Sequence, residues 1–205
     1  MKNFDTKITR LVSYPRTGSH WVRMILEKYL QKYCLPTSFY GNNEYWGYHL
    51  HDREVGNGDE GATDNFEKVI YLYRNPVDVV YSLLKYEGWT TQEKINEIIN
   101  EYKVHLTRWK LNNNDIKKII FIKYEDIVEN PENTFSEIIN FLGEDWDKDK
   151  LMKIYSESTH KNLSKNINDE NVIDRGHFSG SYKTNKHAFT LKHGKYIMDQ
   201  FKELL

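Results

Sequence analysis

The stretch ITRLVSYPRTGSHW, residues 8–21, decides the fold of this chain. Residues 8–14 have an apolar centre and predict a short β-strand. Pro15 and Gly18 then interrupt the extended pattern. From residue 19 to residue 33 apolar side chains recur at helical spacing, and Ser19 is placed to be the N-cap. A strand, a turn and a helix in this order are typical of the opening of a parallel α/β fold.

The rest of the chain repeats this alternation of strands and helices. Near-continuous apolar runs at residues 69–73 and 119–122 predict two more buried parallel strands. Asn75-Pro76 and Asn130-Pro131 each predict a helix start directly after or close to such a strand. Helices are also expected at residues 92–111, 148–156 and 190–205. Long irregular segments are expected at residues 35–47 and 158–190. We find no internal repeat or linker, so we expect one domain over residues 1–205.

Composition excludes several classes of protein. The net charge of −1 and a pI of about 6.7 give no global basic balance that would indicate a nucleic acid or a membrane surface as partner. No apolar run approaches the length of a membrane span, and the polar N-terminus is unlike a signal peptide. Cys34 is the single cysteine, so no internal disulfide can form. We therefore expect a reducing, cytoplasmic location. The sequence carries no signal for an oligomeric state.

The turn at residues 14–19 has the chemistry of an anion site. A glycine-containing loop before a helix directs backbone N–H groups and the positive end of the helix dipole at one point. Arg16 adds a positive charge, and Ser19 adds a hydroxyl donor. An ordinary βα turn would use the same proline and glycine, so the loop alone leaves both interpretations open. The loop is not a Walker A motif, because it lacks Gly-Lys-Ser/Thr.

A second polar pair follows the strand at residues 69–73. Arg74 stands at its carboxyl end, and Ser82 lies eight positions on, about two helical turns into the next helix. Open α/β sheets bind ligands at the carboxyl ends of their strands. The alternative is an exposed arginine and a solvated serine.

Together the two segments resemble two motifs of the sulfotransferases. SYPRTGSHW (13–21) resembles the phosphosulfate-binding loop written YPKSGTTW, with Arg16 in place of its lysine, and RNPVDVVYS (74–82) resembles the motif that binds the donor's 3′-phosphate. The resemblance implies a three-layer, P-loop-like α/β fold with a central parallel sheet flanked by helices. It also implies transfer of a sulfuryl group from 3′-phosphoadenosine 5′-phosphosulfate (PAPS) to a hydroxyl or amine of a small-molecule acceptor. The product is then adenosine 3′,5′-bisphosphate (PAP), and no metal is needed.

The resemblance assigns a role to individual residues. The 5′-phosphosulfate is expected at Arg16 and at the backbone N–H groups of Thr17, Gly18, Ser19 and His20. Trp21 is expected against the adenine, with Tyr124 of the segment KYED (123–126) near it. Arg74 and Ser82 are the expected 3′-phosphate ligands. RGHFSGSYK (175–183) partly matches a C-terminal loop of the family, which adds Arg175 and Gly176 to the donor site. Thr159 and His160 align poorly with an adenine-contacting pair.

The catalytic base is expected between the two motifs. In cytosolic sulfotransferases it is a histidine in a Lys-Thr-His segment, and HLHD (49–52) aligns His51 with that base and His49 with the lysine. A carboxylate such as Glu44 is the alternative. Two rival functions are an ATP-dependent phosphotransferase of P-loop type and a non-catalytic nucleotide-binding protein of the same fold.

Overall fold

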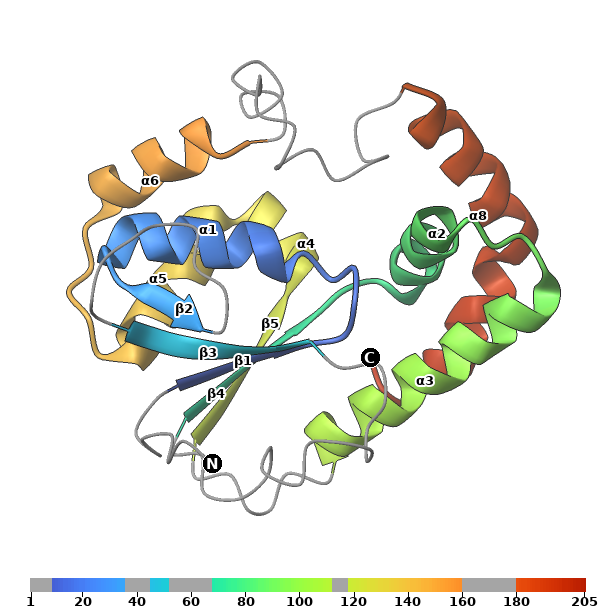
Figure 1. The fold of residues 1–205 in the computed structure, drawn as a ribbon, viewed down its shortest axis with the longest axis horizontal. Helices are drawn as coiled ribbons and strands as arrows, with labels where there is room; N and C mark the ends of the chain where they lie inside the picture. The colour runs from blue at the N-terminus through green and yellow to red at the C-terminus, as the bar shows by residue number, and fades with distance from the viewer. Residues whose placement is uncertain (1–8, 36–44, 52–67, 112–117, 160–179) are drawn as a thin grey trace.

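The chain is built around a five-stranded sheet with the strand order β2-β3-β1-β4-β5 (Figure 1). The computed structural model describes residues 9–35, 45–51, 68–111, 118–159 and 180–205. Every paired strand runs parallel to its neighbour. The strands are β1 (Thr9–Ser13), β2 (Tyr33–Leu35), β3 (Tyr45–His51), β4 (Lys68–Tyr73) and β5 (Lys118–Lys123).

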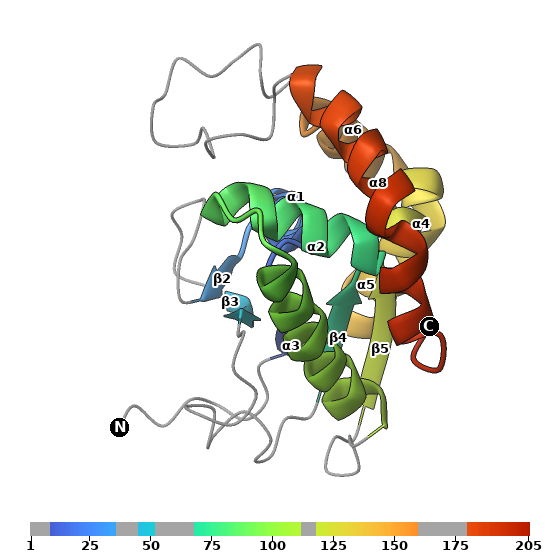
Figure 2. The same ribbon diagram turned by 90° about the vertical axis from the view of Figure 1, so that its right-hand side faces the viewer.

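Helices cover both faces of the sheet and give the fold three layers. One face carries α1 (Ser19–Leu30), α4 (Tyr124–Glu129), α5 (Pro131–Leu142) and α6 (Lys148–Glu157). The other face carries α2 (Pro76–Glu87), α3 (Gln92–Leu111) and α8 (Gly180–Phe201). Figure 1 shows the two groups of helices on opposite sides of the strands, and Figure 2 is seen from the side that carries α2, α3 and α8. The three-layer α/β fold expected from the sequence is therefore confirmed.

Alternation along the strands divides the core into two clusters. In β1, Leu11 packs toward the α1 face and Val12 toward the α2 face. In β4, Ile70 packs toward α1 while Tyr71 packs toward α2. Successive side chains of a strand point to opposite faces, so a strand buried on both sides must be apolar at every position. This explains the continuous apolar runs in the sequence.

Local signals place most of the helix ends. The Asn75 side chain caps α2 by accepting from the Val77 N–H at 2.9 Å, and Pro76 is the first helical residue, as expected. Gly143 ends α5 with a left-handed backbone at φ 84°. The N-cap expected at Ser19 is wrong. Gly18 holds that position, at φ 97°, and Ser19 is the first residue of α1.

Three expectations for the irregular segments need correction. The segment expected to be irregular at 35–47 contains the end of β2 and the start of β3. The long loop expected over 158–190 is wrong for its last part, because α8 begins at Gly180. The helix expected to run to residue 33 stops at Leu30, because Gln31 takes a left-handed backbone at φ 56° and the chain turns into β2.

The connections after β1 and β4 leave the sheet in opposite directions. From β1 the chain passes through α1 toward β2 and β3, whereas from β4 it passes through α2 and α3 toward β5. The two strands are neighbours, with Ser13 paired to Leu72. Their carboxyl ends therefore form the topological switch point of the sheet, where open α/β folds bind ligands.

Candidate functional site

Three strand ends meet at the switch point. Ser13, the last residue of β1, pairs with His51 at the end of β3 on one side and with Leu72 of β4 on the other. The loop at residues 14–18 leaves β1 from between these two neighbours. The sheet thus brings three backbone segments together. Two are the segments that resemble donor motifs, and the third contains His51, the expected base. The side chains of His49 and His51 lie outside the described residues.

The two motifs are in direct contact. Arg16 Nε donates a hydrogen bond to Ser82 Oγ at 3.2 Å, and a guanidinium nitrogen of Arg74 donates to the Arg16 carbonyl at 3.3 Å. Ser82 is buried on α2, and Arg16 has a left-handed backbone at φ 70°. Two residues of positive φ, Arg16 and Gly18, shape this loop. Changes of backbone handedness in short loops can turn successive N–H groups toward one point and so form anion-binding concavities.

Arg74 is held by contacts on several sides. Its guanidinium lies 3.3 Å from Asp78 Oδ2 and 4.3 Å from the ring centroid of Tyr124. Asp78 also pairs with Lys186 of α8 at 2.7 Å. Among the described residues, the buried Arg74 Nε has no hydrogen-bond partner. A buried polar atom of this kind needs a partner, which water, an ion or a ligand can supply.

Tyr124 fills the space between the two motifs. A Cβ atom on Gly18 would lie 2.5 Å from the ring carbons Cδ2 and Cε2 of Tyr124, so only glycine allows this approach. The same ring packs against Arg74 and lies 5.9 Å from Trp21, centroid to centroid. Trp21 Nε1 donates to the carbonyl of Ser158 at 2.7 Å. Tyr124 and Trp21 therefore form an aromatic wall beside the loop.

Helix α3 supports both motifs from behind. The Tyr14 hydroxyl donates to Glu101 Oε2 at 2.8 Å. The Tyr102 hydroxyl donates to the carbonyl of Arg74 at 2.8 Å and accepts from its N–H at 3.1 Å. Burial raises the pKa of the Tyr102 hydroxyl, so it stays protonated at every ordinary pH.

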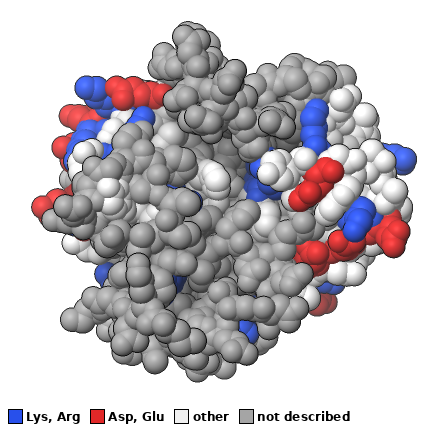
Figure 3. All heavy atoms as spheres, in the orientation of Figure 1, with Lys and Arg blue, Asp and Glu red and all other residues white. Residues whose placement is uncertain are grey.

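The positive charge of the site comes from two neighbouring arginines rather than from a broad basic face. On the face shown in Figure 3, Lys and Arg lie among Asp and Glu over the coloured surface, without a broad region of one sign. Arg16 and Arg74 are nevertheless in contact at the switch point. Within the described part of the chain, we find no group of three His, Cys, Asp or Glu side chains placed to hold a metal. None of its helices combines the length and apolarity needed to cross a bilayer.

Most of the donor-site residues expected from the sequence lie around one point. Arg16, Gly18, Arg74, Ser82 and Tyr124 are linked by contacts. Trp21 joins them through Tyr124, and Thr17, Ser19 and His20 lie on the same turn. Thr17 is buried, and its hydroxyl donates to the Tyr14 carbonyl at 2.8 Å, which leaves its backbone N–H as the group that could face an anion. Thr159 directly follows Ser158, whose carbonyl accepts from Trp21. Glu44, His160, Arg175 and Gly176 lie outside the described residues.

Sequence reasoning missed four residues of this site. Tyr102 follows the helical apolar pattern of α3 and is typical of a packed helix, and Glu101 is the charged residue beside it. Asp78 lies in the first turn of α2, and its carboxylate pairs with Arg74 and Lys186. Lys186 lies in a segment expected to be a loop. No local signal identifies the Asp78–Lys186 pair, because more than a hundred residues separate its members.

These features define a parallel α/β protein with two contacting arginines and a glycine-containing loop at its switch point. The family model of the sulfotransferase domain matches residues 49–205. The chain therefore belongs to the sulfotransferase domain family. Among curated relatives, it is 24% identical to the amine sulfotransferase of Oryctolagus cuniculus, over 84% of this chain and 70% of that one. It is also 24% identical to cytosolic sulfotransferase 13 of Arabidopsis thaliana, over 73% of this chain and 59% of that one.

Solved structures share the fold. Mouse sulfotransferase SULT7A1 complexed with PAP aligns with a TM-score of 0.64 and 19% identity, over 98% of this chain and 85% of that one. Retinol dehydratase in complex with androsterone and PAP aligns with a TM-score of 0.62 and 12% identity, over 97% and 82% of the two chains. At these identities the likeness concerns the fold alone.

Proposed function

We propose that this protein transfers the sulfuryl group of PAPS to a hydroxyl or amine of a small-molecule acceptor and releases PAP. Membership of the sulfotransferase family supports the reaction class. The PAP complexes of two structural neighbours support the donor. The observation that carries the proposal is the contact between the two motifs, where Arg16 Nε lies 3.2 Å from Ser82 Oγ and Arg74 reaches the Arg16 carbonyl.

In this proposal, the two ends of PAPS bind to different residues. Arg74 and Ser82 hold the 3′-phosphate, and Arg175 and Gly176 add further contacts. The backbone N–H groups of residues 17–20 and the side chain of Arg16 hold the 5′-phosphosulfate. Trp21 and Tyr124 contact the adenine. The unpartnered Nε of Arg74 supports a phosphate ligand there, because a guanidinium binds phosphate oxygens through two parallel N–H groups.

The chemistry requires positive charge on one side of sulfur and a base on the other. An acceptor oxygen or nitrogen forms a bond to sulfur as the bond between sulfur and the bridging phosphate oxygen breaks. Charge develops on the phosphate that leaves, and Arg16 with the loop N–H groups stabilises it. Arginine keeps its proton at any ordinary pH, so Arg16 acts through charge and hydrogen bonds, without donating a proton to the leaving phosphate.

We assign the base to His51. The β1–β3 register supports this assignment, because the His51 backbone pairs with Ser13, one residue before the donor loop begins. The His51→Ala variant should lose turnover by about 10²–10⁴-fold, the usual contribution of a general base, while keeping its affinity for PAP. His187→Ala, at an exposed position of α8, is the matched control. Near-normal turnover of His51→Ala would reject the assignment and leave Glu44 or His49 as the base.

Two measurements test the donor and the transfer. Thermal unfolding is followed with PAP and, separately, with Mg-ATP; we expect stabilisation by PAP alone. Stabilisation by Mg-ATP without any by PAP would favour a phosphotransferase and overturn the proposal. Transfer of labelled sulfate from PAPS is then measured with phenols, alcohols, amines and sugars. Tight PAP binding with no turnover on any acceptor would instead indicate a non-catalytic nucleotide-binding protein.

A further inference from the structure

The backbone of Arg74 is held by a single side chain from another element. Strand β4 ends at Tyr73 and α2 begins at Pro76, so the peptide groups of Arg74 lie between the end of the sheet and the start of the helix. The Tyr102 hydroxyl meets both of them, donating to the carbonyl at 2.8 Å and accepting from the N–H at 3.1 Å. One hydroxyl thus satisfies the donor and the acceptor of one residue.

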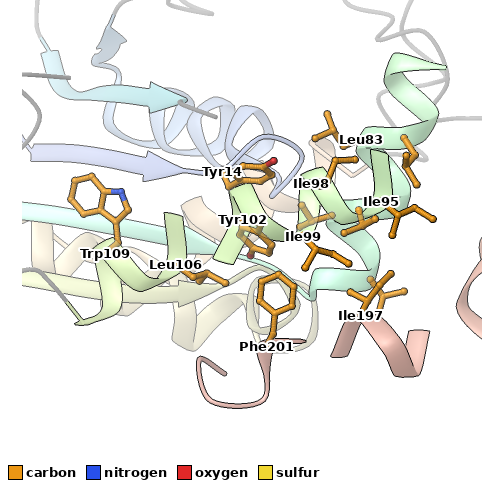
Figure 4. Packing of buried hydrophobic residues seen from close by; sticks show 14 of the residues in the cluster. Tyr14, Leu83, Ile95, Ile98, Ile99, Tyr102, Leu106, Trp109, Ile197 and Phe201 are labelled. Carbon is orange, nitrogen blue, oxygen red and sulfur yellow. The ribbon is translucent and has the colours of Figure 1, made fainter. Parts of the chain in front are cut away.

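Packing fixes this hydroxyl in place. Tyr102 is 0% exposed, and its ring centroid lies 4.8 Å from that of Tyr14 and 5.4 Å from that of Phe201. Figure 4 shows the Tyr102 ring between these two residues. Because burial keeps the hydroxyl protonated, it always has a hydrogen to donate to Arg74. A buried ring with this packing has little freedom to turn, which suits a group that holds another in position.

Glu101, the residue before Tyr102 in α3, contacts the other motif. Glu101 accepts a hydrogen bond from the hydroxyl of Tyr14, which directly precedes the loop, at 2.8 Å. Successive residues of one helix therefore contact residues of both donor motifs. The direction of the Arg74 side chain depends on its backbone, and the approach of the loop N–H groups depends on where Tyr14 lies.

We propose that Tyr102 is a positioning residue for the 3′-phosphate subsite and that Glu101, through Tyr14, is a positioning residue for the loop. This inference rests on the proposed function, in which Arg74 binds the 3′-phosphate. Neither residue contacts the donor. Tyr102 fixes the position of the Arg74 guanidinium, and Glu101 fixes the position of the loop at residues 14–18. Small displacements of binding groups are costly, because hydrogen bonds weaken steeply with distance and angle.

The decisive experiment compares two ligands that differ in the 3′-phosphate. Dissociation constants of PAP and adenosine 5′-monophosphate (AMP) are measured by calorimetry on the full chain. For Tyr102→Phe we expect affinity for PAP to fall about tenfold and affinity for AMP to stay unchanged, since only PAP reaches Arg74. The ratio of the two constants is a readout that a general loss of stability does not move.

The chain offers a matched control. Tyr71 is also 0% exposed, and its hydroxyl lies 2.8 Å from His105 Nδ1 rather than against a backbone group of either motif. Tyr71→Phe removes a buried hydrogen-bonded hydroxyl just as Tyr102→Phe does, so the two variants should lose similar stability. We expect Tyr71→Phe to keep the ratio of PAP to AMP affinity seen in the unmodified protein.

Glu101 gives the opposite pattern. Glu101→Ala removes the carboxylate that Tyr14 contacts and loosens the loop that both ligands share. Its affinities for PAP and AMP should therefore fall by the same factor, with the ratio unchanged. If Glu101→Ala binds both ligands as tightly as the unmodified protein, Glu101 has no positioning role.

The outcomes separate this inference from the function on which it rests. Failure of the unmodified protein to bind PAP rejects the proposed function and the inference with it. Normal PAP binding combined with an unchanged ratio in Tyr102→Phe rejects the inference alone, and so does an equal change of ratio in Tyr71→Phe. Should Tyr102→Phe not fold, Tyr102→Met, with its adaptable side chain, carries the same expectation.

Discussion

At the residue scale, the site depends on how the Arg74 side chain comes to meet the backbone of a second arginine, Arg16. Arg16 and Arg74 repel each other, yet a guanidinium nitrogen of Arg74 reaches the Arg16 carbonyl. Asp78 offsets part of the charge through its contact with Arg74 at 3.3 Å. In the proposed function, the polyanionic donor neutralises the remaining positive charge of the two arginines.

Arg74 should contribute more to donor affinity than any exposed arginine. We expect Arg74→Ala to weaken PAP binding by about 2–4 kcal/mol, the scale for losing one partner of a desolvated charge pair. Calorimetric titration measures this loss, and Arg108→Ala on α3 serves as a control arginine remote from the loop. Equal PAP affinities of Arg74→Ala and the unmodified protein would refute the role of Arg74.

Gly18 combines a left-handed backbone with a close neighbour. Its φ is 97°, and an added Cβ would meet the Tyr124 ring at 2.5 Å. Gly18→Ala should cost about 2–5 kcal/mol of unfolding free energy, as the sum of the left-handed backbone strain and the overpacking. It should also weaken PAP binding, because the displaced Tyr124 ring carries the Arg74 contact.

Gly88 is the matched control for this substitution. It has a φ of 72°, but an added Cβ would meet nothing within 4 Å. Gly88→Ala should therefore cost only the backbone strain, about 1–2 kcal/mol. Denaturant unfolding of both variants checks the difference, and equal losses would mean that Tyr124 does not constrain position 18.

At the element scale, α8 is the element that completes the α2 and α3 face. Its Ile197 and Phe201, four residues apart, are both 0% exposed and belong to the cluster that contains Tyr14 and Tyr102. Lys186, near its start, pairs with Asp78 of α2 beside Arg74. The helix thus links the core beneath the site to the ion pairs around it.

The buried stripe of α8 should carry most of its stabilising effect. We expect Phe201→Ala to lower the free energy of unfolding by about 3–5 kcal/mol, the range for removing a buried aromatic ring. Leu191→Ala, at a position 75% exposed on the same helix, should change it by less than about 0.5 kcal/mol. Chemical denaturation tests both, and a small effect at Phe201 would show that α8 is not docked on the core.

At the scale of the whole molecule, the burial of Cys34 ties the reactivity of its thiol to global stability. This single cysteine is buried in β2, and burial raises the pKa of its thiol from 9.0 to about 12. The unfolded thiol ionises first, so the stability that burial of the neutral thiol contributes is complete below about pH 9. That contribution is lost as the pH rises through 9 toward 12. At neutral pH the thiol should therefore react only when the protein opens.

Labelling of Cys34 should consequently report donor binding. A ligand present at about 100 times its dissociation constant stabilises the folded state by about 2.7 kcal/mol. PAP at that concentration should slow the reaction of Cys34 with a thiol reagent about 100-fold, whereas Mg-ATP should leave the rate unchanged. Reaction at an unaltered rate with saturating PAP would show that β2 opens independently of the donor site.

Much of the fold and part of the site could be predicted because their signals are local. The apolar runs at residues 69–73 and 119–122 are needed by any strand that is buried on both faces, and they correctly indicated β4 and β5. Asn75-Pro76 correctly indicated the start of α2. The start of α8 at Gly180 was missed, because its N-terminal half is polar and lacks the apolar period by which helices are identified.

The sequence by itself determined the α/β class, the family and the two segments that resemble donor motifs, since each depends on residue types at short, fixed spacings. Only the tertiary structure decided that Arg16 meets Ser82, that Tyr124 packs between Gly18 and Arg74, and that Tyr102 holds the Arg74 backbone. The members of these pairs lie 28 to 106 positions apart in the chain, and a contact across such a separation depends on strand order and helix packing. No local pattern encodes that order. It follows from burying both faces of the sheet at once.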